Sequence, residues 1–227
     1  MERIKILTFS GSSGVGKTTV VNELLKLKPA PQLVTSLTTR RHRQTDLLHE
    51  YRYVSEKEFE KLKKQGEFLW VVSVHNNSYG TLRSSVNSAL AREGISLMIL
   101  TPDVIPILLG CAPKGVVVPM FITPPSEQIL RERLKKRGEE NEVIDRRISD
   151  CAAWHKSAKV SGIPYEFIDN EGTVDETIAK IARFLKKGKD TQCSSNFKSP
   201  RRSGDSLWAV RDSNPRPLRC KRSALIN

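Results

Sequence analysis

The sequence has no long hydrophobic run, because none of its apolar stretches approaches the ~18 residues that a membrane-spanning helix needs. Its N-terminus also lacks the basic segment, apolar stretch and cleavage site of a secretory signal. These absences predict a cytosolic location and no membrane partner.

Hydrophobic residues make up 38% of the 227-residue chain, which suits one compact domain with some chain left over.

Cysteine is scarce and scattered. The chain has four cysteines without any C-x-x-C pair, at Cys111, Cys151, Cys193 and Cys220. This spacing favours neither a zinc site nor a small domain built on disulfides.

Negative charge is also in short supply, and the formal net charge is +13. Residues 186–227 carry +8 of it, so residues 1–185 carry only +5. Because the excess lies near the C-terminus, nucleic-acid binding by the folded part is not favoured.

The most informative motif present is a complete phosphate-binding loop, G-x-x-x-x-G-K-[ST], which begins at Gly11 and ends at Lys17 and Thr18. In such loops backbone N–H groups point at the anion, the lysine reaches the β- and γ-phosphates, and the threonine hydroxyl is offered to Mg²⁺. A strand is predicted over 3–9 and a helix over 18–28, so the phosphate meets a helix N-terminus. The motif predicts that Thr18 binds Mg²⁺ and that ATP is bound by nine residues: Gly11, Ser12, Ser13, Gly14, Val15, Gly16, Lys17, Thr18 and Thr19.

Strand and helix signals alternate through residue 185, which predicts the α/β class. Continuous apolar runs over 95–101 and 116–122 are typical of strands buried on both faces of a parallel sheet. Ser55 and Glu58 form a capping box that opens a helix. We also expect helices over 126–137 and 174–185 and a strand over 165–168.

Residues 189–227 are rich in Ser, Arg, Lys and Pro and show no sustained periodicity, so a basic disordered tail is predicted after a domain over 1–188. The segment 212–215 reads Asp-Ser-Asn-Pro, which GAT-TCG-AAC-CC can encode. That string is the complement of the T-arm sequence shared by transfer RNA genes. We interpret the tail as a reading frame that runs into an antisense tRNA gene, so that its charge has no functional meaning.

A second set of phosphate-binding side chains follows the loop. Arg40 and Arg43 stand three residues apart and can converge on one phosphate, and the hydroxyls of nearby tyrosines add neutral donors. The alternative is a solvated basic loop. Aromatic residues and paired threonines around the two arginines make that alternative less plausible.

In order and spacing, the segments 36–43, 51–55, 67–69 and 74–81 resemble the nucleotide-monophosphate-binding region of guanylate kinases, and the resemblance covers roughly residues 3–185. It implies a P-loop NTPase-type parallel sheet flanked by helices, with a small NMP-binding subdomain over about 37–83 and a lid over about 137–147. It further implies an ATP-dependent nucleoside monophosphate kinase that transfers the γ-phosphoryl group directly, in line, to GMP or dGMP.

The resemblance also assigns roles by position. The GMP phosphate would be held by Arg40, Arg43, Tyr51 and Tyr79, and the guanine approached by Ser36 and Thr81. Arg137 and Arg147 would clamp the phosphates and neutralise charge as the phosphoryl group moves. The loop 168–171 resembles the loop beside the adenine of ATP. Four other cations near the lid are interpreted as solvated charge: Arg131, Arg133, Lys135 and Lys136.

The chain departs from the family at two acidic positions. Trp70 stands where guanylate kinases usually have a glutamate that accepts hydrogen bonds from guanine. The usual Asp-x-Asp is replaced by Leu100-Thr101-Pro102, with Asp103 one step late. Losing a two-pronged carboxylate should weaken guanine selection by about 10²-fold or more. Trp70 either lines the base pocket as a substrate-binding residue or belongs to the core.

Three functions remain open at this point. The first is a guanylate kinase, and the second is a related kinase with relaxed or different base or substrate specificity. The third is a guanylate-kinase-like binding module. Such modules typically lose the phosphate loop, whereas this chain has Lys17 and Thr18. An enzyme is therefore favoured.

Overall fold

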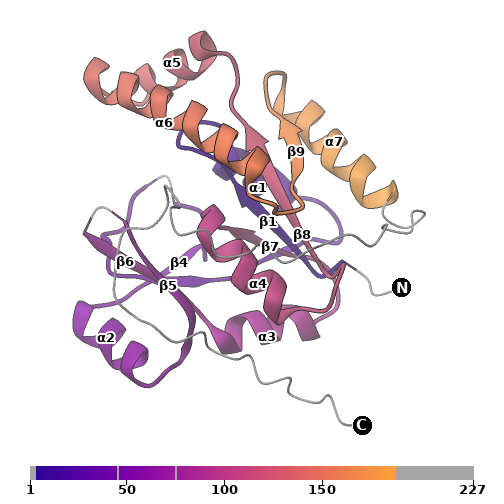
Figure 1. Ribbon diagram of the computed structural model, residues 1–227. Helices are drawn as coiled ribbons and strands as arrows, with labels where there is room; N and C mark the ends of the chain where they lie inside the picture. The colour runs from indigo at the N-terminus through magenta and orange to yellow at the C-terminus, as the bar shows by residue number, and fades with distance from the viewer. Residues whose placement is uncertain (1–3, 45, 75, 188–227) are drawn as a thin grey trace.

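The computed structural model describes residues 4–44, 46–74 and 76–187, so the tail predicted over 189–227 lies outside the described residues (Figure 1). A five-stranded sheet has the order β2-β7-β1-β8-β9, and its neighbouring strands are all parallel. Its strands are β1 (Ile6–Ser10), β2 (Gln32–Leu33), β7 (Ser96–Ile99), β8 (Val117–Thr123) and β9 (Glu166–Asp169). This sheet confirms the predicted α/β class.

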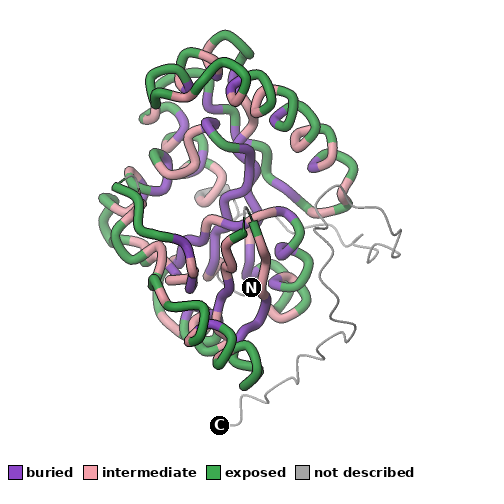
Figure 2. The backbone as a smooth tube through the Cα atoms, turned by 90° about the vertical axis from the view of Figure 1, so that its left-hand side faces the viewer, coloured by how far each residue is buried: buried purple, intermediate pink, exposed green. Residues whose placement is uncertain are grey.

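Helices cover both faces of this sheet because successive strand residues point to opposite sides. Ile6 and Leu7 of β1, for example, belong to different hydrophobic clusters. Buried side chains of α1 (Lys17–Leu24) and α7 (Val174–Lys187) share the cluster of Leu7, and those of α3 (Arg83–Ala91) and α4 (Ile105–Cys111) share the cluster of Ile6. Figure 2 shows the result, with buried backbone along the central strands and exposed backbone on the outer helices.

A second, four-stranded sheet has the order β4-β3-β6-β5 and lies within residues 36–82. Its strands are β3 (Ser36–Thr38), β4 (Tyr51–Tyr53), β5 (Phe68–Val74) and β6 (Asn77–Leu82). Phe59 of α2 (Glu56–Lys64) packs on Leu37 and Phe68. On β5, Trp70 instead joins the cluster of Ile6. The second sheet is therefore packed against the first, and its closure over a substrate as an NMP-binding subdomain stays a prediction.

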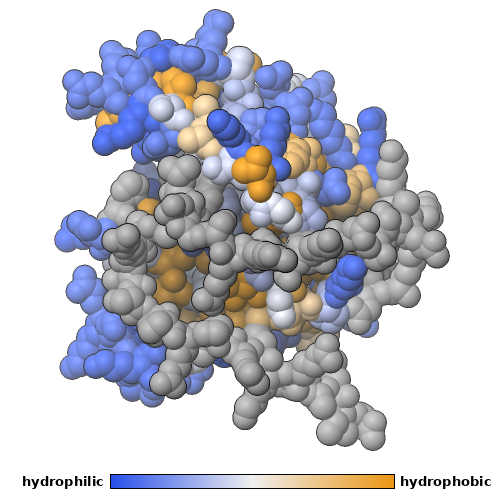
Figure 3. All heavy atoms as spheres, in the orientation of Figure 1, coloured by the Kyte–Doolittle hydropathy of each residue, from blue (hydrophilic) through white to orange (hydrophobic). Residues whose placement is uncertain are grey.

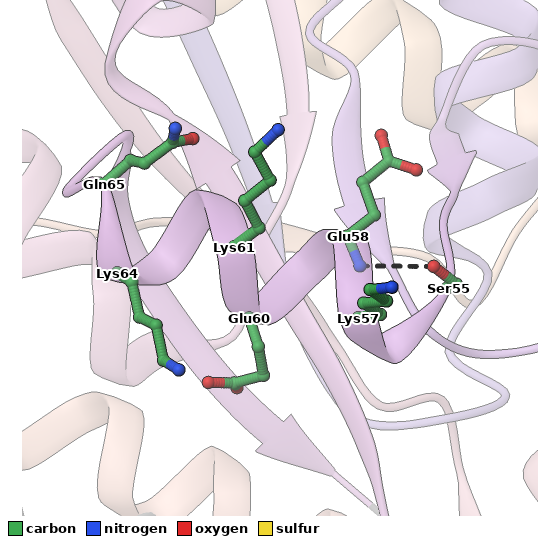
Figure 4. Close-up of a pocket in the computed structure, with 7 residues that line it drawn as sticks. All are labelled: Ser55, Lys57, Glu58, Glu60, Lys61, Lys64 and Gln65. Carbon is green, nitrogen blue, oxygen red and sulfur yellow. Dashed lines mark hydrogen bonds between the residues drawn. The ribbon is translucent and has the colours of Figure 1, made fainter.

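The predicted helix start at Ser55 is confirmed, because the Ser55 hydroxyl accepts from the Glu58 N–H at 3.2 Å (Figure 4). The Glu58 carboxylate is paired with Arg52, so the second bond of the capping box stays a prediction. The pocket beside this bond is lined by α2 and by the residues that cap its two ends, Ser55 and Gln65 (Figure 4). It holds no residue of either predicted phosphate site.

Two elements sit at the predicted lid. Helix α5 (Glu127–Lys135) begins after the Ser126 cap, as expected, and α6 (Asn141–Val160) extends far beyond the short segment recognised in the sequence. Figure 1 shows α5 and α6 together at one end of the molecule, away from α2. The helix after the phosphate loop ends at Leu24, four residues before the predicted end.

None of the helices in the described ranges is both long enough and apolar enough to span a bilayer. Figure 3 shows mainly hydrophilic residues over α2 and over the end formed by α5 and α6.

Candidate active site

The phosphate loop connects β1 to α1 and depends on its glycines. Gly11, Gly14 and Gly16 have φ angles of 143°, 88° and 100°, a region that L-residues rarely adopt. Space is short as well, because a Cβ on Gly11 would lie 2.8 Å from the carbonyl oxygen of Ile122. A Cβ on Gly16 would lie 2.3 Å from Nδ2 of Asn170. The loop is thus enclosed by the ends of β8 and β9, where parallel sheets bind nucleotides.

Lys17 lies at the start of α1 and folds back over its own loop. Its Nζ donates to the carbonyl oxygens of Gly11 and Ser12, both at 2.7 Å. Burial of the ammonium lowers the pKa of Lys17 to about 8, and the charge of Arg137 lowers it further, while Cys151 and Glu50 oppose the shift. The side chain remains mainly charged at pH 7 and is placed to meet phosphate oxygens at the loop.

This pKa predicts a pH-dependent affinity for ATP. Above pH 8 the Lys17 amine loses its proton, and a neutral amine no longer attracts the phosphates. The apparent KM for ATP should therefore rise by about 10-fold between pH 7 and pH 9. Initial rates measured at saturating acceptor across that range test this, and a flat KM for ATP up to pH 9 would contradict it.

The two arginines assigned to the lid are placed differently. Arg147 of α6 donates to the Ser13 hydroxyl and forms an ion pair with Glu139 at 2.8 Å. One helical turn later, Cys151 contacts the Ser12 hydroxyl. The structure therefore brings Arg147 to the phosphate loop. Arg137 lies exposed just after α5, close enough for its charge to act on Lys17.

The interpretation of Arg133 as solvated charge is wrong. Its Nη2 donates to the carbonyl oxygen of Asn170 at 3.2 Å, and its Nη1 is buried without a hydrogen-bond partner among the described residues. Asn170 in turn donates to the carbonyl oxygen of Val15 in the phosphate loop, at 2.7 Å. Arg133 and Arg137 are four residues apart, which places them on the same side of a helix. This spacing was the feature of the sequence that could have linked Arg133 to the phosphate loop. Arg131 is paired with Asp145 at 2.7 Å, on the protein surface.

Residues predicted to hold the acceptor share one face of the second sheet. Ser36 and Thr81 are hydrogen-bonded through their hydroxyls at 2.8 Å. Tyr51 is paired with Ser36 across β3 and β4, and its ring centroid lies 5.8 Å from that of Tyr79. The structure thus gathers four of the predicted acceptor residues on this face.

Arg40 lies at the edge of the same group and is 8% exposed. Its Nη2 pairs with Asp46 at 2.8 Å, and its guanidinium carbon lies 5.3 Å from the centroid of the Tyr51 ring. The Arg43 side chain is exposed, and its backbone N–H donates to Asp46. The pattern in the sequence identified the two arginines but not the carboxylate that links them.

Trp70 is 6% exposed and packs in the same hydrophobic cluster as Leu100. This burial favours the interpretation of Trp70 as a core residue. Trp70 is nevertheless paired with Thr81 across β5 and β6, so it neighbours the hydroxyl pair. Its contact with a base stays a prediction. Asp103 is exposed in the short 3-10 helix η1 (Pro102–Val104).

Another residue that sequence reasoning missed is Glu50, a half-buried carboxylate next to Tyr51. Burial raises the pKa of Glu50, and the backbone N–H of Leu47 donates to its Oε2 at 3.2 Å. Burial and the neighbouring Glu50 charge also raise the pKa of Tyr51, which therefore stays a neutral hydroxyl donor. The Glu50 charge acts on both Lys17 and Arg40.

The residues present fit the Mg²⁺ that the motif implies. Thr18 is half-buried in the first turn of α1, directly after Lys17. Within the described ranges, no three His, Cys, Asp or Glu side chains cluster as a ready-made metal site. Mg²⁺ suits this arrangement because it keeps several waters and takes most other ligands from substrate phosphates. The Thr18 hydroxyl would be the ligand that the phosphate loop contributes.

Comparisons with known proteins agree on one family. The family model described as "Guanylate kinase" matches residues 3–188. A guanylate kinase of Nitrosomonas europaea is 33% identical over 181 residues, which cover 78% of this chain and 88% of that protein. One of Alkalilimnicola ehrlichii is 38% identical, with 76% and 83% covered. The crystal structure of a guanylate kinase from Anaplasma phagocytophilum matches with a TM-score of 0.61 at 24% identity, covering 84% of this chain and 88% of that one.

Proposed function

The chain belongs to the guanylate kinase family, and from this premise we propose that it is a cytoplasmic, ATP-dependent guanylate kinase. It transfers the γ-phosphoryl group of ATP to the phosphate of GMP or dGMP, giving ADP and GDP or dGDP. The observation that carries the proposal is the presence of two separate groups of phosphate-binding side chains. Lys17 lies over the phosphate loop, and Arg40 lies with Tyr51 and Tyr79 on the second sheet.

The donor side is built by the phosphate loop and the lid. Lys17 would meet the β- and γ-phosphates, and the Thr18 hydroxyl would hold Mg²⁺, which would supply further neutralisation of the phosphate charge. Arg147, already at Ser13, and Arg137 add positive charge as the phosphoryl group moves. Arg133 and Asn170 form the wall of the loop on the side where the adenine is expected.

The acceptor side is built by the second sheet. The GMP phosphate is held by Arg40 and Arg43 and by the hydroxyls of Tyr51 and Tyr79. Its base extends along the same face toward the Ser36–Thr81 pair and the edge of Trp70. Transfer would then need no covalent enzyme intermediate, because these cations and donors would hold the two phosphates in line for direct transfer.

Removing either acceptor arginine tests this division of labour. Arg40→Ala or Arg43→Ala should raise the apparent KM for GMP by about 10–150-fold, because a charge-assisted hydrogen bond is lost. The KM for ATP should change far less. Steady-state kinetics with each substrate varied in turn provides the comparison, and an equal rise in both KM values would argue against the assignment.

The departures from the family at Trp70 and Leu100 affect the selection of the base. We infer that guanine is read mainly by the Ser36–Thr81 hydroxyl pair, since Trp70 and Leu100 are buried in one apolar cluster. Hydroxyls accept and donate hydrogen bonds but carry no charge, so they discriminate less strongly than a carboxylate. GMP remains the best acceptor, with a smaller margin over other monophosphates.

A further inference from the structure

Asp46 lies on the loop between β3 and β4, and its carboxylate accepts three hydrogen bonds. Oδ1 accepts from Nη2 of Arg40 at 2.8 Å. Oδ2 accepts from the backbone N–H of Arg43 at 2.8 Å and from the Tyr53 hydroxyl at 2.6 Å. One side chain therefore connects an acceptor arginine, the backbone of the second acceptor arginine and the end of β4.

The Asp46–Arg40 pair is almost removed from solvent, with the two side chains 9% and 8% exposed. Burial opposes ionisation of Asp46, but the bonds from Arg40, Tyr53 and Arg43 outweigh it and lower the pKa of the carboxyl. Burial also works against the charge of Arg40, but the bond to Asp46 and the charges of Asp46, Tyr79 and Tyr53 together raise the pKa of Arg40. Both groups are charged at neutral pH, and each keeps the other charged.

The pair fixes the orientation of the guanidinium. Nη2 is bound to Asp46, Nη1 donates to the carbonyl oxygen of Arg41 at 2.8 Å, and the group lies near the rings of Tyr51 and Tyr53. A guanidinium has five N–H donors, so others remain for a phosphate. A donor group held before the substrate arrives loses little conformational entropy on binding.

We propose that Asp46 is the positioning residue of the acceptor-phosphate site. It holds Arg40 and the backbone of Arg43 in the geometry that receives the phosphate of the nucleoside monophosphate. This inference rests on the proposed function, because it takes that phosphate as the ligand of Arg40. Asp46 acts through Arg40 and Arg43 and does not touch the substrate.

Charge alone gives the opposite expectation, and this makes the proposal testable. Asp46 is an anion beside a site for an anion, so neutralising it should strengthen GMP binding if the side chain were only a neighbouring charge. If it positions Arg40, the same substitution should weaken GMP binding. The sign of the change in KM therefore distinguishes the two roles.

The decisive variant is Asp46→Asn, which keeps the shape of the side chain. The Asn amide keeps one acceptor oxygen but replaces the other with an NH₂ group. That NH₂ group is itself a donor, so it cannot accept the hydrogen bonds that the second carboxylate oxygen accepted. We expect the KM for GMP to rise by about 10-fold and the KM for ATP to change less than about 2-fold. The matched control is Glu58→Gln, which neutralises the carboxylate of the exposed Arg52–Glu58 pair in the same sheet region and should leave both KM values unchanged.

Two further variants keep the test valid if Asp46→Asn folds poorly. Tyr53→Phe removes one of the three bonds without changing charge and should raise the KM for GMP by about 3-fold. Asp46→Glu retains the carboxylate and should recover part of the affinity that Asp46→Asn loses. A melting temperature recorded for each variant separates unfolding from misplacement.

The outcomes separate the inference from the proposed function. A wild-type chain that does not phosphorylate GMP overturns the proposed function. A wild-type chain that does so, with Asp46→Asn or Tyr53→Phe leaving the KM for GMP unchanged or lower, overturns the positioning role alone. An equal rise in the KM values for GMP and ATP also overturns it, because the effect is then not confined to the acceptor site.

Discussion

Lys17→Ala should abolish phosphoryl transfer, lowering kcat by about 10³-fold or more, and leave the fold intact. The Lys17 ammonium is bonded to two carbonyl oxygens of the phosphate loop, and Lys17 belongs to none of the three hydrophobic clusters of the described residues. Its replacement removes the cation that neutralises the moving phosphates. The measurement is turnover with ATP and GMP, with circular dichroism recorded on the same preparation.

The matched control for this variant is Lys26→Ala. Lys26 follows α1 and pairs with Glu23 on the surface, where an ion pair contributes about 0–1 kcal/mol. It should therefore keep wild-type turnover. Near wild-type turnover in Lys17→Ala would contradict the assignment of the phosphate loop as the donor site.

Trp70→Glu should destabilise the protein by several kcal/mol, because it places a carboxylate in an apolar cluster that includes Leu100. Thermal unfolding of the variant measures this loss against Trp70→Phe, which keeps an aromatic ring in the cluster. A Trp70→Glu protein as stable as the wild type would contradict the core placement. If it also selected GMP over AMP about 10-fold better, position 70 would belong to the base pocket.

The conformation of the phosphate loop was predictable from sequence because it depends on local residues. One continuous segment supplies the glycines, the lysine and the threonine, and the φ angles and close contacts of Gly11 and Gly16 show why no other residue fits there. The runs over 95–101 and 116–122 were equally clear, because strands buried on both faces need no alternation.

The acceptor site was only partly predictable because it depends on contacts between separate segments. Ser36 and Thr81 are 45 residues apart and meet only once β3 and β6 pair. The strands β3 and β4 have three residues each, too few for a periodic signal. Asp46 belongs to no motif, and its role follows from three bonds that only the folded loop creates.

The lid shows a different limit of sequence reasoning. Helix α6 carries charged and polar residues along most of its length, so its apolar stripe is weak, and only the segment around Arg147 was recognised. Arg133 was misassigned because a charge on a polar helix is usually solvated. Leu130 and Leu134 pack close to Gly14, and this contact turns the Arg133 side of α5 toward the loop.

The most direct test of the account is the initial rate of phosphoryl transfer from ATP and Mg²⁺ to GMP, dGMP, AMP, UMP and CMP, with the products identified. The account predicts the highest kcat/KM for GMP, with dGMP also accepted, and one ADP and one nucleoside diphosphate formed per turnover. A higher kcat/KM for AMP, UMP or CMP, or no turnover with any of the five, would contradict it.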